Sequence, residues 1–307
     1  MKFALAFNFV FACFVPSLGH SKEPPRRAKP PVWSRDVLDA FFDDAREHLV
    51  GERPASANTT NTQLASKNAA GEQPATGGFA WSQRISAETV TQEIKRVANT
   101  LRTPLANPSR FKSGGFQECR QSFAQLAVLF GILAEHDKKP RWQQEATGLR
   151  MAFAKTAENC KVATDQSYRD ATLRKQDLED LLRGQRPTIE PAELPKWSTL
   201  ADRELLMRWM ETSQENVGPM LANERAFKRE NEKLQQQAQL LSALGEIVQR
   251  EEYDYWDDDG YLEYARALQT SASEVSDAAS VGDFPKAREA AGRVGQSCSQ
   301  CHEDYRG

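Results

Sequence analysis

The stretch Cys298-Ser299-Gln300-Cys301-His302 decides how the rest of this chain is interpreted. C-x-x-C-H is the attachment signature of c-type haem, in which two thiols add across the porphyrin vinyl groups and the adjacent imidazole ligates the iron. Residues three and four apart share one face of a helix, so both cysteines and the histidine can face a single haem. We therefore predict one covalently attached haem c, anchored by Cys298 and Cys301, with His302 as the axial iron ligand.

Two other interpretations of the motif are a structural disulfide and half of a zinc site. A zinc site needs two more Cys or His ligands nearby. The other histidines, His20, His48 and His136, lie far upstream. The haem interpretation is therefore preferred.

The first 19 residues predict a signal peptide. Met1-Lys2 gives a positive start, residues 3–18 are almost wholly apolar, and small residues up to Gly19 suit cleavage. An apolar stretch this short does not span a membrane, so we expect no membrane span in the mature chain. A lipoprotein site at Cys13 is a weaker alternative. Export to the periplasm fits the haem, since c-type haem is attached outside the bacterial cytoplasm.

Residues 20–80 read as a spacer between the signal peptide and the main body. A basic, proline-rich stretch at 21–31 is followed by a predicted amphipathic helix at 34–49. We expect that helix to pack against the body rather than bind a membrane, because its polar side is more acidic than basic. Residues 51–80 form a low-complexity linker with hardly a large apolar side chain.

From Trp81 the chain repeats itself at an offset of 116 residues. The matched pairs are Trp81-Ser82 with Trp197-Ser198, Leu105-Ala106-Asn107 with Leu221-Ala222-Asn223, and Phe111-Lys112 with Phe227-Lys228. A period this long indicates duplicated domains rather than a solenoid. We predict one domain at 81–196 and a second at 197–307.

Each repeat contains four helical stretches and no strand-like alternation. They are expected at about 86–102, 115–135, 141–162 and 167–184, and again at 199–217, 223–250, 259–279 and 284–305. Short connections between amphipathic helices favour antiparallel bundles. The predicted fold is all-α, with two tandem antiparallel four-helix bundles.

The second repeat resembles the cytochrome c′ family, the class II c-type cytochromes, over about residues 197–307. Those proteins are four-helix bundles with C-x-x-C-H on the last helix, often followed by an aromatic and a basic residue, here Tyr305 and Arg306. The first helix of those proteins resembles the pattern Arg-x-x-x-Met-x-x-Met, which appears here as Arg203, Met207 and Met210. The resemblance implies that Arg203 lies near a haem propionate and that Met207 lies over the distal face of the iron.

The sixth position of the iron leaves two functions open. Five residues follow His302 in this sequence, so we expect whatever faces the iron to come from an earlier helix. If Met207 only crowds that position, the resemblance implies a five-coordinate haem that binds NO or CO. If Met207 ligates the iron, the protein is a six-coordinate electron carrier. A third interpretation is an interaction module that docks a redox partner through the first repeat; catalysis is the weakest, because no acid, base or second metal stands out.

The first repeat lacks the haem chemistry. At the offset of 116, the motif positions are occupied by Leu182, Gln185 and Arg186, so we expect no covalent haem there. The resemblance implies homodimers that pack through their first two helices, and the first repeat is expected to supply that partner within the chain as a pseudo-dimer. Association of two chains remains the alternative.

Three other features complete the sequence predictions. Cys119 and Cys160 are expected to lie across a helical hairpin and to form a disulfide, with two buried thiols as the alternative. His136, in the turn of that hairpin, is expected to be exposed to solvent. The formal net charge of −3 gives no electrostatic footprint for nucleic acid.

Overall fold

The structure is a computed structural model that describes residues 79–187, 189 and 195–306. These residues belong to one compact unit, Glu72–Gly307. The predicted signal peptide, the amphipathic helix of the spacer and the linker as far as residue 78 lie outside the described residues and stay predictions, whereas Phe79 at the end of the predicted linker packs against the core. Within the described ranges the chain forms helices and turns and no strand, which confirms the all-α fold class.

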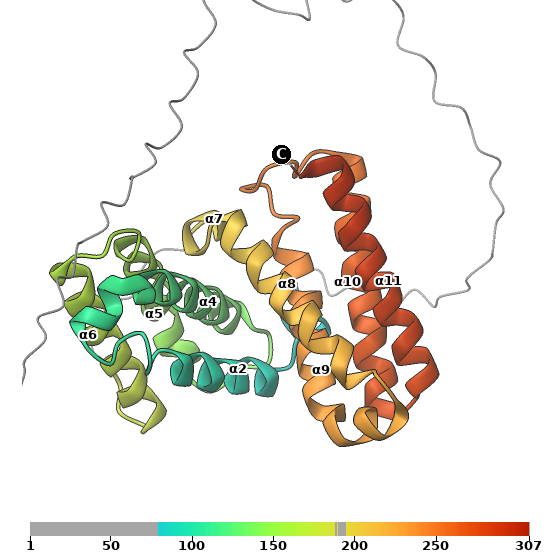
Figure 1. The fold of residues 1–307 in the computed structure, drawn as a ribbon, viewed down its shortest axis with the longest axis horizontal. Helices are drawn as coiled ribbons and strands as arrows, with labels where there is room; N and C mark the ends of the chain where they lie inside the picture. The colour runs from blue at the N-terminus through green and yellow to red at the C-terminus, as the bar shows by residue number, and fades with distance from the viewer. Residues whose placement is uncertain (1–78, 188, 190–194, 307) are drawn as a thin grey trace, which may run out of the picture. The chain divides into compact units, whose positions relative to one another are not determined.

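The first repeat folds into four long helices and three short helical segments. The long helices are α2 (Ala87–Thr100), α4 (Phe116–Glu135), α5 (Gln143–Asn159) and α6 (Asp165–Leu182); the short ones are η2 (Trp81–Gln83), α3 (Pro108–Arg110) and the π-helical η3 (Phe111–Gly115). Helix α4 packs against α2 and α5, and α6 contacts all three. The four long helices therefore form one bundle (Figure 1).

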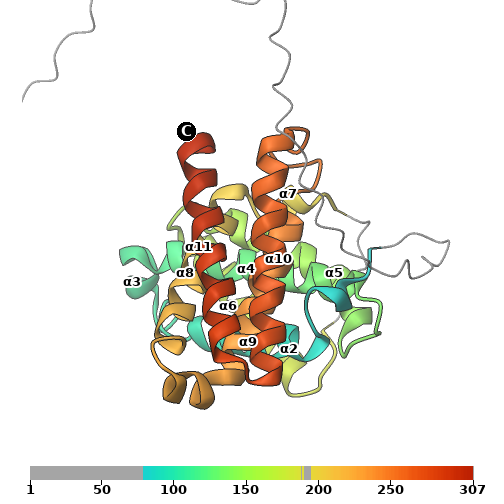
Figure 2. The same cartoon turned by 90° about the vertical axis from the view of Figure 1, so that its right-hand side faces the viewer.

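The second repeat places four long helices after the short α7 (Trp197–Leu200). They are α8 (Arg203–Met220), α9 (Glu224–Ile247), α10 (Asp259–Val281) and α11 (Phe284–Tyr305). Each packs against the next, and α11 returns to contact α8, which closes a four-helix bundle. Helices α10 and α11, the last two of the chain, lie side by side (Figure 2).

Side-chain caps fix where the helices of the second repeat begin. Asn223, Asp258 and Asp283 each accept a hydrogen bond from the backbone N–H three residues on, at 2.9, 3.0 and 3.0 Å. Such caps satisfy one of the orphan donors of the first turn. The predicted starts of α9, α10 and α11 were thus within one residue of those observed.

The predicted first helix of this repeat was wrong at both ends. The observed helix, α8, begins at Arg203 rather than at 199, because Asp202 is its N-cap. The residues before the cap form the separate single turn α7. Helix α8 continues past the predicted end at residue 217, through Gly218-Pro219, as far as Met220. Pro219 has no N–H to donate, but the hydrogen bonding of the helix resumes directly after it, since the N–H of Leu221 donates to the carbonyl of Val217 at 3.3 Å.

The two repeats contact each other through equivalent parts. Helices α2 and α8 begin 116 residues apart, at Ala87 and Arg203. The N-cap of α2, Ser86, donates its backbone N–H to Oε1 of Gln239 on α9 at 3.1 Å. Reciprocally, the N-cap of α8, Asp202, accepts from Arg120 on α4 at 2.6 Å. The start of each first helix therefore binds the second helix of the other repeat.

His136 was predicted to be exposed, and this prediction was wrong. The residue is only 2% exposed. Its Nδ1 accepts the backbone N–H of Lys138 at 3.2 Å, so the ring donates from Nε2 to the carbonyl of Ile85, also at 3.2 Å. The turn after α4 folds back onto the chain before α2, and the imidazole satisfies backbone groups that this burial would otherwise leave unpaired.

Candidate haem site

The C-x-x-C-H motif occupies the last turns of α11. An apolar stripe at Ala287, Ala290 and Val294 is buried against the bundle and sets the rotation of the helix. Cys298 continues that stripe and is half-buried, whereas His302 is exposed. Burial, together with the neighbouring Cys301, raises the pKa of the Cys298 thiol to about 11. Both sulfurs thus lie at the boundary between the core and the surface.

Two adjoining pockets, of about 220 and 560 Å³, lie against the motif. Met207, Glu211, Cys301 and His302 line both of them. The smaller pocket also contacts Met210 and Cys298, and the larger one contacts Arg203. The structure therefore brings all six predicted site residues to one place, Arg203, Met207, Met210, Cys298, Cys301 and His302. Their roles toward haem stay predictions.

The apolar wall of the smaller pocket comes from α10, which the sequence analysis did not assign to the site. Tyr261, Tyr264, Ala265 and Leu268 line it. Their spacing of three, four and seven residues marks one face of a helix, and that periodicity is the signal that could have identified them. A motif search overlooks them because apolar helix faces usually pack in a core.

Arg203 is held at the rim of the larger pocket by aromatic rings. Its guanidinium carbon lies 4.9 Å from the ring centre of Tyr255 and 5.3 Å from that of Tyr261. The nearest carboxylate, Asp254, is 3.9 Å away and largely exposed. Burial raises the pKa of Tyr261 to about 12, although Arg203 opposes the rise. A stacked guanidinium with one weak ion pair keeps donors for an anionic group.

Tyrosines fasten the motif end of α11 to the start of α10. The hydroxyl of Tyr305 donates to Oδ1 of Asp258, the N-cap of α10, at 2.5 Å. The hydroxyl of Tyr264 donates to Asp304 at 2.8 Å. The Tyr305 hydrogen bond holds the pKa of Asp258 below its usual value. The motif is therefore fixed relative to the wall of the pocket it faces.

The residues present fit a c-type haem. The site offers two thiols on one helix face, an imidazole beside them, an apolar wall, a thioether and a rim guanidinium suited to a propionate. Within the described ranges no three His, Cys, Asp or Glu side chains are grouped to hold a metal ion. Haem attachment does not require such a group, because the thiols bond the porphyrin and only the imidazole ligates iron.

Cys119 and Cys160, the predicted disulfide, belong to the other repeat. Cys119 lies on α4, and Cys160 is the C-cap of α5, the helix that packs against it. Both are free thiols in the structure and fully buried. Burial raises the pKa of both, to about 12 for Cys160, and the nearby Cys160 raises that of Cys119 further. Their pairing stays a prediction.

Comparisons with known proteins bear on the second repeat. Neither the curated proteins nor the solved structures gave a match. None of the described helices is long and apolar enough to cross a membrane. The sequence model of the family described as Cytochrome C′ matches residues 198–306, which contain α8 to α11 and the whole candidate haem site. The second half of the chain is thus the part that carries the cytochrome c′ family match, as its sequence predicted.

Proposed function

We propose that this protein is an exported, periplasmic c-type cytochrome with one haem, and that it binds a small gas such as NO or CO. Cys298 and Cys301 would hold the haem and His302 would ligate its iron on the proximal side. When bound, haem supplies an iron that takes a diatomic ligand or one electron. Ligand binding, rather than catalysis, is the function proposed.

The observation that supports this proposal is the side chain of Met207. It lines the same two pockets as His302 but comes from α8, and it is only partly buried. Among the described residues that line these pockets there is no second histidine and no lysine to compete for the iron. A thioether is a weak iron ligand, so Met207 can border the distal side without bonding to the iron. The sixth coordination position would then be open to a gas.

An optical spectrum of the full-length haem protein tests this function. The protein is reduced with dithionite and exposed to CO. A broad high-spin band that shifts on adding the gas supports a five-coordinate iron. Sharp low-spin bands that do not respond to CO contradict it. His302→Ala should change the spectrum of any haem that still attaches; an unchanged spectrum would remove His302 from the proximal role.

The second candidate is a six-coordinate electron carrier. The position of Met207 also allows this function, because a thioether that lines the same pockets as His302 could ligate the iron. The variant Met207→Leu separates the two. If Met207 is a ligand, Met207→Leu converts low-spin bands to high-spin ones and creates CO binding. Met210→Leu is the matched control, because Met210 lines the smaller pocket, is 7% exposed and lies three residues away on the same helix. A ligand role for Met207 requires that only the first variant changes the spectrum.

For the first repeat we propose the role of a built-in dimer partner. The support is that Ser86 and Asp202, which are related by the offset of 116, each contact the second helix of the other repeat, at Gln239 and at Arg120. Since α2 and α4 then cover α8 and α9, sedimentation should show one chain per particle. A stable homodimer would contradict this role. Binding of a redox partner that survives mutation of the haem motif but is lost on mutation of the first repeat would favour the interaction-module alternative.

A further inference from the structure

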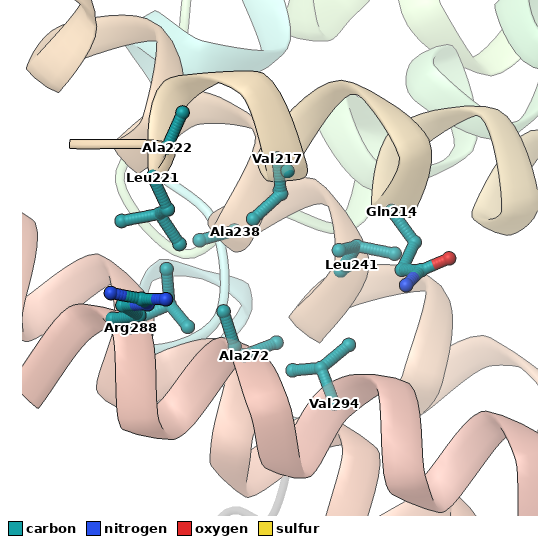
Figure 3. A pocket seen from close by; sticks show the side chains of 12 residues that line it. Gln214, Val217, Leu221, Ala222, Ala238, Leu241, Ala272, Arg288 and Val294 are labelled. Carbon is teal, nitrogen blue, oxygen red and sulfur yellow. The ribbon is translucent and has the colours of Figure 1, made fainter. Parts of the chain in front are cut away.

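A separate cavity of about 320 Å³ lies in the interior of the second bundle. All four long helices contribute to it, with Val217 from α8, Leu241 from α9, Ala272 from α10 and Val294 from α11, and Leu221 lines it from the C-cap of α8. Figure 3 shows Val217 and Leu221 facing Ala272 and Val294 across the space. Its size and apolar lining are those of a site for a small organic molecule.

Two polar side chains lie at opposite ends of this cavity, as Figure 3 shows. Gln214 lies at one end and also lines the smaller haem pocket, so the two sites share a wall. Arg288 lies at the other end and is exposed. The ends of the cavity therefore differ in charge, with a cation only at the end away from the haem site.

The guanidinium of Arg288 has no ion pair among the described residues. The adjacent carboxylate, Glu289, pairs instead with Arg293 at 2.7 Å. Arg293 also binds Glu274 on α10. The guanidinium of Arg288 is therefore available to bind an anionic ligand at the mouth of an apolar cavity.

We propose that this cavity binds a small amphiphilic carboxylate, such as a medium-chain fatty acid. The apolar tail would lie among Val217, Leu241 and Val294, and the carboxylate would pair with Arg288. A guanidinium presents two parallel N–H donors that match a carboxylate, which gives this end its specificity. The end of the tail would reach Gln214 and the shared wall. This inference goes beyond the proposed function and does not require gas binding.

Isothermal titration of the full-length haem protein with octanoate and with octan-1-ol tests the proposal. Octanoate should bind about threefold more tightly than the alcohol, because an ion pair with an exposed guanidinium is screened by solvent and contributes up to about 1 kcal/mol. Arg288→Gln should weaken octanoate by about threefold and leave octan-1-ol unchanged. Lys286→Gln is the control, since it also removes one positive charge from the start of α11, two residues from Arg288. Lys286 does not line the cavity. It should leave both affinities unchanged.

Filling the cavity tests the position of the tail. Ala291 lines the cavity and is only half-buried, so Ala291→Phe should fill it without unfolding the bundle. Both ligands should then lose affinity, with an unchanged circular dichroism spectrum. Three results would overturn the proposal: no octanoate binding to the unmodified protein, equal loss of both ligands in Arg288→Gln, or undiminished binding in Ala291→Phe. The CO spectrum decides the proposed function separately.

Discussion

Asp137 shows how a single charge joins two parts of the first repeat. Its carboxylate oxygens accept from the backbone N–H of Ser82 at 2.8 Å and from the Ser82 hydroxyl at 2.6 Å. Burial opposes the charged form, but these hydrogen bonds outweigh it and hold the pKa of Asp137 at about 2 instead of 3.8. The bonds tie the segment before α2 to the turn after α4. The folded state therefore prefers the ionised carboxylate.

The depressed pKa of Asp137 makes stability depend on pH. A group whose folded pKa is lowered contributes stability above its unfolded pKa, and that contribution is lost as pH falls from about 4 to about 2. At pH 5 the free energy of unfolding of the unmodified protein should exceed that of Asp137→Asn by about 1 kcal/mol, after allowance for solvent screening. This difference should shrink toward pH 2. Urea unfolding at several pH values measures it. Asp257→Asn, at an exposed acid, is the control; a difference independent of pH would contradict the prediction.

Cys119 and Cys160 are predicted to form a disulfide when the protein is exported. Intact-mass spectrometry after alkylation in denaturant should then show no modification of these two residues unless the protein is first reduced. The bond would close a loop of about 40 residues and contribute up to about 4 kcal/mol through the unfolded state. Alkylation of both thiols without reduction would show that they are buried free thiols instead.

Single residues also mark where sequence reasoning fails. The C-x-x-C-H motif could be identified because its spacing carries a specific chemistry. The burial of His136 could not, because it depends on Ile85, which is 51 residues away. The position of Gln214 could not be predicted either. It shares a helix face with Met207, but only the structure shows that it lines two cavities.

At the scale of elements, caps could be predicted and close packing could not. Asp283 as the N-cap and Pro285 in the first turn are local signals that mark the start of α11. Asp202 caps α8 after the break that follows α7, and α7 itself packs against α4 and α5 of the other repeat. The amphipathic pattern overran this break because it carries no information on those contacts.

Gly131 lies on α4 where this helix packs against α7. A Cβ atom there would lie 2.8 Å from Cδ1 of Leu200 and 3.1 Å from the ring of Trp197. Gly131→Ala should therefore lower the free energy of unfolding by about 1–2 kcal/mol, because overpacking outweighs the better helix propensity of alanine. Gly292→Ala on α11 meets nothing within 4 Å and should instead raise stability by about 0.5–1 kcal/mol. Urea unfolding distinguishes them; equal effects would contradict the close approach.

At the scale of the whole described body, the helical class and the grouping of the site residues could be predicted, whereas the contacts between the repeats could not. Periodicity fixes which face of each helix is buried, but not which second surface covers it. Trp81 and Trp197, related by the offset of 116, pack against each other with ring centres 5.3 Å apart. The repeated sequence predicted both rings but not their contact.

Gln239 couples the two repeats and provides the test of whether they unfold together. Its Oε1 accepts from the backbone of Ser86 at 3.1 Å and from the hydroxyl of Thr89 at 2.6 Å. If the repeats form one cooperative unit, the slowest-exchanging amides of α4 and α10 should report the same opening free energy. Gln239→Ala should lower both values together by about 1–2 kcal/mol, since it leaves the buried hydroxyl of Thr89 and the half-buried N–H of Ser86 without this partner.

Hydrogen exchange read by mass spectrometry measures both helices in one experiment. Gln237→Ala is the matched control, because Gln237 lies on the same helix and its side chain makes no hydrogen bond among the described residues. It should leave both values unchanged. If Gln239→Ala lowers protection in α4 alone while α10 keeps its own, the repeats unfold as separate domains. The first repeat would then be a neighbour of the haem domain, and the reciprocal contacts would not be a source of its stability.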